Sequence, residues 1–129
     1  MAALAMAIAM ALTVTVSAAQ APSETETQPY NAAATSVTCA ISYLDQLYRG
    51  SIIGPTTIPK TEVTLILYEE NSIGFIEVDS AKASADTYVC SKTVDYPIEK
   101  GTTYKLTIIA KAYVDNVWDT VTKSIVVTP

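Results

Sequence analysis

The stretch IEKGTTYKLTIIA, residues 98–110, decides the fold class of this chain. Gly101 marks a turn, and Tyr104 opens a run in which every second residue is apolar. An apolar residue at every second position is typical of a β-strand with one buried face. The stretch contains no reactive group, so it predicts a turn followed by a strand but no activity.

The same period of two recurs outward from this stretch. It is found in five further segments, which we expect to be strands: 36–44, 62–69, 73–79, 86–94 and 117–128. Asp115 and Asn116 suit a tight hairpin turn before the last strand, because both residue types tolerate positive φ. No stretch shows the 3.6-residue period of a helix, so the sequence predicts an all-β antiparallel sandwich.

Two segments between these strands are predicted to be irregular. The segment 45–61 contains several glycines and prolines, and we expect a long loop with at most a short edge strand at 51–53. The segment SAKASA, residues 80–85, is predicted to be a polar break after a hairpin. In that hairpin, Gly74 is expected to mark a bulge or a sheet edge.

The N-terminal part differs in composition from the rest of the chain. Residues 1–19 have no charged side chain and resemble a secretory signal peptide, with cleavage expected after Ala18 or Ala19. The alternative is an uncleaved membrane anchor, since about twenty apolar residues can cross a bilayer. Residues 20–35 are predicted to be a flexible acidic tether, and residues 36–129 the sandwich domain. We therefore expect a secreted protein, either released or held at the cell surface.

Size and charge limit the classes of partner. Without its leader the chain is long enough to bury one core, so a single domain is expected. Lys and Arg number 8 against 13 Asp and Glu, a net charge of −5, and the charges are scattered. Nucleic acid backbones are bound by clustered Lys and Arg, so nucleic acid is not an expected partner.

The two cysteines, Cys39 and Cys90, both fall on inward-facing strand positions. In an exported protein such a pair is expected to form a structural disulfide. The alternative is a metal or redox pair, but the chain has no histidine to complete a zinc site and no C-x-x-C spacing. No metal or cofactor is therefore expected.

The spacing Ile98-x-x-Gly101-x-x-Tyr104, followed by an alternating strand and one more strand, resembles the corner before the last two strands of a fibronectin type III or immunoglobulin-like domain. The resemblance implies that Gly101 turns the chain and that Tyr104 is the corner tyrosine, with a buried ring and a hydroxyl bonded to nearby backbone. Residues 88–90, Tyr-Val-Cys, are similar to the Tyr-x-Cys of antibody-type domains. Two strands follow Cys90 instead of one, and no Trp closely follows Cys39, so the chain departs from that family. The layout of leader, tether and one sandwich resembles small uncharacterised secreted proteins of Gram-positive bacteria.

Catalytic chemistry has little support in the sequence. Without histidine, neither a Ser-His-Asp nor a Cys-His arrangement is available. Carboxylates occur in pairs (Glu69 with Glu70, Glu77 with Asp79, and Asp115 with Asp119), but strands usually carry such acids on their solvated face. The stretch 114–119, VDNVWD, has few oxygen ligands for calcium, and a turn explains it better. We expect no enzymatic activity.

Aromatic residues are the better candidates for binding. Trp118 and Tyr113 flank the predicted turn and are expected to lie opposite each other, with Tyr48 and Tyr68 as secondary candidates. The leading expectation is a non-enzymatic extracellular interaction or structural module for an unknown protein or glycan. The alternatives are a carbohydrate-binding accessory protein that uses these aromatics, and a surface-polymer subunit assembled by strand addition at residues 123–129. If Trp118 points inward, it is part of the core.

Overall fold

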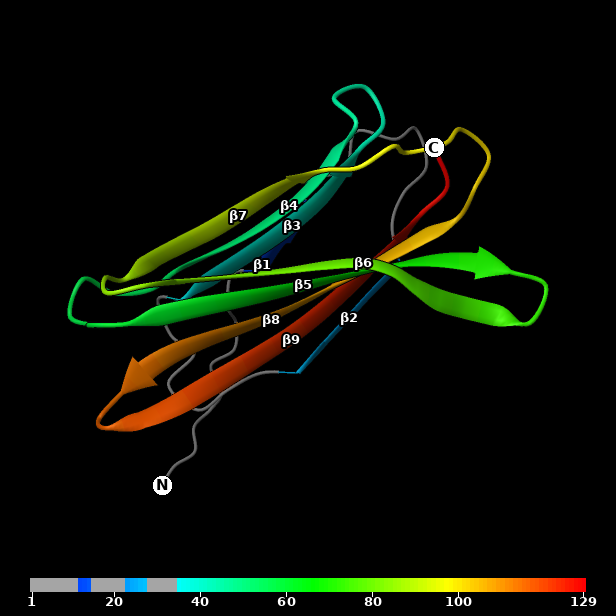
Figure 1. Ribbon diagram of the computed structural model, residues 1–129. Coiled ribbons are helices and arrows are strands. Elements are labelled where there is room, and N and C mark those ends of the chain that lie inside the picture. Colours follow the sequence, from blue (N-terminus) through cyan, green and yellow to red (C-terminus); the bar gives the residue numbers. More distant parts are fainter. Residues whose placement is uncertain (1–11, 15–22, 28–34) are drawn as a thin grey trace.

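The fold consists of two facing β-sheets, as the computed structural model shows for residues 12–14, 23–27 and 35–129 (Figure 1). These residues form nine strands and no helix: β1 (Leu12–Val14), β2 (Ser23–Thr27), β3 (Ser36–Ser42), β4 (Leu47–Ile53), β5 (Thr61–Asn71), β6 (Gly74–Ala85), β7 (Val89–Asp95), β8 (Tyr104–Val114) and β9 (Val117–Val127). The first sheet has the order β1-β3-β4-β7, and the second has the order β2-β9-β8-β5-β6. All pairs are antiparallel except β1 with β3. The prediction of an all-β, two-sheet architecture is confirmed.

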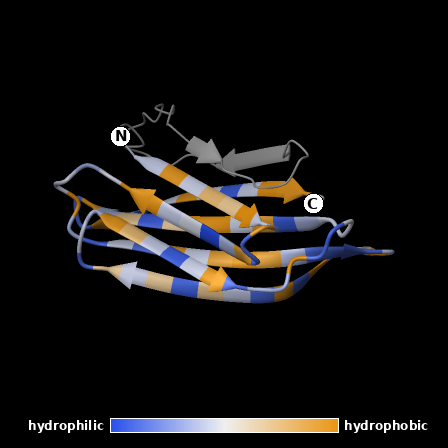
Figure 2. Cartoon of the chain, turned by 90° about the horizontal axis from the view of Figure 1, so that it is seen from above, coloured by the Kyte–Doolittle hydropathy of each residue, from blue (hydrophilic) through white to orange (hydrophobic). Residues whose placement is uncertain are grey.

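The core lies between the sheets, on the faces that the alternating pattern predicted to be buried. In β8 and β9, buried residues alternate with half-buried ones along most of each strand. Figure 2 shows the corresponding alternation of hydrophobic and hydrophilic residues along the strands. Lys123 breaks the pattern, because it occupies a fully buried inward position between Val121 and Ile125. Because lysine is charged, the alternating pattern of apolar residues in the sequence does not identify position 123 as part of the core.

Both predicted hairpins are present. Strands β5 and β6 pair along their whole length, as do β8 and β9. Asp115 and Asn116 form the β8–β9 turn with φ of 50° and 68°, the backbone that the residue types predicted. Gly74, with φ of 133°, opens β6, an edge strand among the described residues of the second sheet. The bulge itself lies further along, where the register shifts between Leu67 and Tyr68.

The two segments predicted to be irregular contain more strand than expected, which is a correction. Within 45–61, β4 is a seven-residue strand at the centre of the first sheet. Gly50 does not break this strand, because its missing side chain leaves room for the opposite sheet: a Cβ there would lie 2.6 Å from Leu65 Cδ2 and 2.7 Å from Ile108 Cδ1. The segment 80–85 continues β6, since its small and polar residues suit an edge strand.

The disulfide predicted between Cys39 and Cys90 is absent, which is a second correction. Both side chains are buried, as expected, but they are not bonded to each other. Cys39 lies opposite Gly50 and Cys90 opposite Ile52, so β4 runs between them. Neighbouring strands lie about 4.8 Å apart, which places the two Cα atoms more than about 9 Å apart. A disulfide requires a separation below about 7 Å.

Some predictions for the N-terminal part fall on residues that the structure does not describe. The expected cleavage site at Ala18 and Ala19 lies outside the described residues, as does most of the leader. Within the predicted tether, Ser23–Thr27 pair with β9 as β2, which differs from a free tether. In the described part of the chain, no helix is long and apolar enough to span a membrane.

Candidate functional site

Tyr104 has a structural role at the corner before β8. Its side chain is buried, and its hydroxyl accepts a 2.8 Å hydrogen bond from the backbone N–H of Glu99. Burial raises the pKa of this hydroxyl. Gly101, with φ of 88°, turns the chain and donates its N–H to the carbonyl of Pro129 at 2.8 Å. This is the geometry that the resemblance implied for Tyr104 and Gly101, and it fixes the corner rather than forming a site.

Trp118 and Tyr113 lie opposite each other beside the β8–β9 turn. They are register partners, and their ring centroids are 5.2 Å apart with an interplanar angle of 59°. Trp118 is 41% exposed, so the alternative that it points into the core is wrong. Lys60, in the loop before β5, places its Nζ 5.5 Å from the Tyr113 ring centroid, and its carbonyl accepts the Tyr113 N–H at 3.0 Å. The pair therefore forms an ordered aromatic surface with a cation beside it.

A hollow of about 320 Å³ extends from Trp118 across the outer face of the second sheet. We call it the Trp118 hollow, and its lining residues are Lys60, Thr61, Glu62, Lys82, Ser84, Ala85, Asp86 and Trp118. They come from the start of β5, the end of β6 and the start of β9, which the sheet order brings to the same end of the sheet. The hollow thus combines an aromatic wall with charged and hydroxyl groups.

Two polar contacts involve residues that line the Trp118 hollow. Lys82 Nζ and Glu62 Oε2 form an ion pair at 2.8 Å across β5 and β6. The Thr61 hydroxyl, which is buried, donates to the carbonyl of Thr87 at 2.8 Å. Carboxylates, ammonium groups and hydroxyls together supply both donors and acceptors to a ligand. This arrangement suits a hydroxyl-rich ligand with one apolar face against Trp118.

Tyr48 does not belong to any surface site, which corrects its choice as a ligand-binding candidate. It is 0% exposed on β4, and its ring packs edge-on against Tyr96 with centroids 6.3 Å apart. Its hydroxyl donates to Asp79 Oδ2 at 2.8 Å, linking the first sheet to β6 of the second. Burial, and then the hydrogen bond to Asp79, raise the pKa of Tyr48.

Tyr68 lies on the outer face of the second sheet, toward the other end from Trp118. Lys105 places its Nζ 4.6 Å from the Tyr68 ring centroid and 5.1 Å from that of Phe75. This group is separate from the Trp118 hollow, whose lining does not include it. Tyr68, a secondary candidate, therefore does not belong to the same surface as Trp118 and Tyr113.

The carboxylates of Glu77 and Asp79 lie on opposite faces of β6. The bulge makes Tyr68 the partner of Glu77 and Leu67 the partner of Asp79, so Glu77 faces outward and Asp79 faces Tyr48. Regular alternation would place residues 77 and 79 on the same face of a strand, and the extra residue at Val78 reverses the alternation between them. Among the described residues, no group of three or more Asp, Glu, Cys or His side chains is arranged to hold a metal ion.

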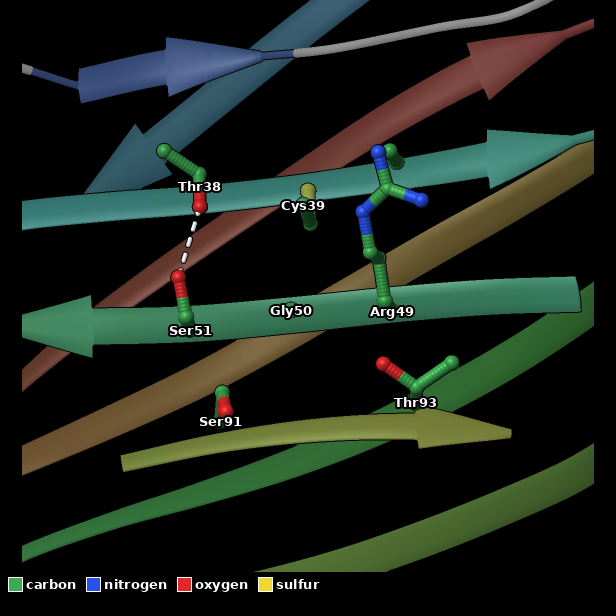
Figure 3. Close-up of a pocket in the computed structure, with 8 residues that line it drawn as sticks. Thr38, Cys39, Arg49, Gly50, Ser51, Ser91 and Thr93 are labelled. Atoms are coloured by element: carbon green, nitrogen blue, oxygen red, sulfur yellow. Dashed lines mark hydrogen bonds between the residues drawn. The ribbon is translucent and has the colours of Figure 1, made fainter. Parts of the chain in front are cut away.

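A second hollow, which the sequence did not predict, lies on the outer face of the first sheet (Figure 3). It has a volume of about 180 Å³ and is lined by Thr38, Cys39, Ala40, Arg49, Gly50, Ser51, Ser91 and Thr93. We call it the Arg49 hollow. Its residues come from three strands, and β4, which contributes the central ones, was predicted to be mostly loop. The sequence signal that was available is the presence of a single arginine in the chain.

Comparisons with protein-family models, with curated proteins and with solved structures gave no match to this chain. The interpretation of the two hollows therefore depends on their geometry and chemistry.

Proposed function

We propose that the domain is an immunoglobulin-like sandwich of the fibronectin type III kind. Strands β3 to β9, lettered in chain order as A, B, C, C′, E, F and G, give one sheet A-B-E and another G-F-C-C′. Immunoglobulin-like sandwiches place strands A, B and E in one sheet and C, F and G in the other. Tyr104, the first residue of β8, takes the place of the corner tyrosine near the start of strand F.

We further propose that the protein is a secreted, non-enzymatic binding module whose ligand is a carbohydrate. The observation that carries this proposal is the Trp118 hollow, in which an exposed indole borders a polar cavity. A sugar presents a face of C–H groups and a rim of hydroxyls, so it needs an aromatic surface and polar groups at the same place. Glu62 and Asp86 can accept from its hydroxyls, while Lys60 can donate to them.

The alternative of a surface polymer built through residues 123–129 has less support. Most of this segment belongs to β9, whose two edges are both occupied: β8 pairs with one edge, and β2 pairs with the other from Thr122 to Val126. Strand addition there requires β2 to leave.

The proposal is tested by titrating the purified protein with a panel of soluble cell-surface polysaccharides and glycans. Because Trp118 is the only tryptophan, the emission spectrum reports this site alone. Saturable binding should shift the emission, and calorimetry should give the affinity. Trp118→Ala should weaken binding at least about tenfold, since a central aromatic contact is commonly worth more than 1 kcal/mol.

A matched control removes an exposed apolar side chain elsewhere. Ile73 is 87% exposed and belongs to the β5–β6 turn, whereas Trp118 lies beside the β8–β9 turn. Figure 1 shows these two turns at opposite ends of the second sheet. Ile73→Ala should leave binding unchanged. If no glycan shifts the emission, or if Trp118→Ala binds as well as the unaltered protein, the carbohydrate proposal is wrong.

A further inference from the structure

The Arg49 hollow has a lining unlike the rest of this acidic chain. It contains one guanidinium and four hydroxyl groups, but no carboxylate; the polar residues are Thr38, Arg49, Ser51, Ser91 and Thr93. The chain as a whole carries a net charge of −5. A concave site that excludes acids and contains a cation favours an anionic group, because the low-dielectric walls strengthen its field.

Arg49 is available to bind such a group. It lies on the outer face of β4 between Ala40 of β3 and Thr93 of β7, and Figure 3 shows its side chain reaching toward β3. Among the described residues, no carboxylate forms an ion pair with Arg49. The planar guanidinium can donate two parallel hydrogen bonds to one carboxylate, which gives both affinity and orientation.

The hydroxyl groups of the hollow lie on all three of its strands, on both sides of Arg49. Thr38 and Ser51 are joined by a 2.8 Å hydrogen bond, which orders the hydroxyls on one side of the hollow. Ser91 and Thr93 stand two residues apart on β7 and point outward on the other side of β4 (Figure 3). A hydroxyl group both donates and accepts hydrogen bonds, so these four hydroxyls suit a ligand that has hydroxyl groups of its own, such as a sugar, better than an anion that has none. The volume of about 180 Å³ suits one small ring or its charged substituent.

We propose that the Arg49 hollow binds the carboxylate of a uronic acid unit, with Arg49 pairing with the carboxylate and Ser91 and Thr93 contacting the neighbouring sugar hydroxyls. This site is on the first sheet, whereas the Trp118 hollow is on the second, so the proposal stands independently of the function proposed for Trp118. It implies that the protein has affinity for acidic saccharides even where the Trp118 hollow is altered.

The test is a titration of the ¹⁵N-labelled protein with glucuronate, with glucose and acetate as separate arms. Glucuronate should shift the backbone amide signals of Thr38, Ser51 and Thr93 in a saturable manner. Glucose, which lacks the carboxylate, should leave these signals unmoved. Acetate, which lacks the hydroxyls, should shift them with weaker affinity than glucuronate.

Variants assign the binding to the hollow. Arg49→Gln should weaken glucuronate binding at least about tenfold, because a hydrogen bond to a charged group is lost. Thr93→Val keeps the side-chain shape and should weaken it several-fold. Lys100→Gln removes the same charge from the turn before β8 and should have no effect. Circular dichroism and Trp118 emission establish that each variant is folded.

Several results would overturn the proposal. Absence of any glucuronate-induced shift would do so, as would equal affinity in Arg49→Gln. Shifts centred on surface lysines would mean a general attraction of anions. Equal shifts with glucose would remove the role of the carboxylate, and equal affinity for acetate would remove the role of the sugar.

Discussion

Gly50→Ala should destabilise the protein by overfilling the space between the sheets. The added Cβ would lie 2.6 Å from Leu65 Cδ2 and 2.7 Å from Ile108 Cδ1, whereas carbon atoms in contact normally lie about 3.5 to 4.0 Å apart. Both neighbours are fully buried on the opposite sheet, so neither can turn toward solvent. An overlap of this size in a packed core costs about 1 to 3 kcal/mol. In a domain of this size, each 1 kcal/mol lowers Tm by about 4 to 8 °C.

The assay is chemical denaturation of Gly50→Ala, Ile108→Val and the double variant. Ile108→Val deletes the Cδ1 atom that the new Cβ would meet, and alone it should cost about 0.5 to 1.5 kcal/mol. In the double variant the contact with Ile108 Cδ1 is gone and only the contact with Leu65 Cδ2 remains, so the combined loss should be about 1 kcal/mol smaller than the sum of the two single losses. Gly54→Ala is the comparison: its Cβ would meet one side chain, that of Ile58 in the β4–β5 loop, instead of two from the opposite sheet, so the loss of stability should be smaller. An additive double variant, or a Gly50→Ala protein within about 0.5 kcal/mol of the unaltered one, would refute the close approach of the sheets at Gly50.

Three further predictions concern single side chains. Tyr104→Phe should lower the free energy of unfolding by about 0.5 to 1.5 kcal/mol, because the backbone N–H of Glu99 loses its acceptor. Urea denaturation measures this loss, and an unchanged free energy of unfolding would mean that water replaces the corner hydrogen bond. Burial raises the pKa of Tyr48 and Tyr104 above the usual 10.0, so their contribution to stability is complete below pH 10. As the pH rises further, the free energy of unfolding should fall. The fall should be shallower in Tyr48→Phe, and an unchanged slope would contradict the role of Tyr48. Asn116→Gly should raise the free energy of unfolding by up to about 1 kcal/mol, and Tm with it, because glycine adopts φ of 68° without strain. A lower Tm would show that the asparagine side chain stabilises the turn.

The strands that the sequence predicted best are those whose two faces have different surroundings. In β8, the inward face is apolar and the outward face is mostly polar, so the period of two is clear and residues 104–114 are predicted almost to the residue. In β4 the alternation is hidden, because Gly50 takes the place of an apolar inward residue and Ile53 is exposed. The packing reason for Gly50 is on the opposite sheet, and no local pattern in the sequence records it.

The site residues show the same limit. Trp118 and Tyr113 could be paired from the sequence because a two-residue turn fixes the register of the strands on either side of it. Tyr48 was wrongly predicted to be a surface residue because its strand was not recognised. Glu77 and Asp79 face opposite sides of β6 because a bulge at Val78 reverses the alternation. The Arg49 hollow is formed by β3, β4 and β7 together. More than thirty residues of chain separate β3 and β4 from β7, so the hollow can be recognised only when the sheet order is known.

The rate at which the buried thiol of Cys90 is alkylated reports how often the first sheet opens. Burial raises the pKa of Cys90, and the side chain is only 4% exposed, so an alkylating reagent cannot reach a reactive thiolate while the sheets are packed. Under native conditions the rate of alkylation then equals the intrinsic rate multiplied by the fraction of molecules in which the first sheet has opened. Because no disulfide has to be reduced first, this rate follows the opening of the sandwich without any denaturant.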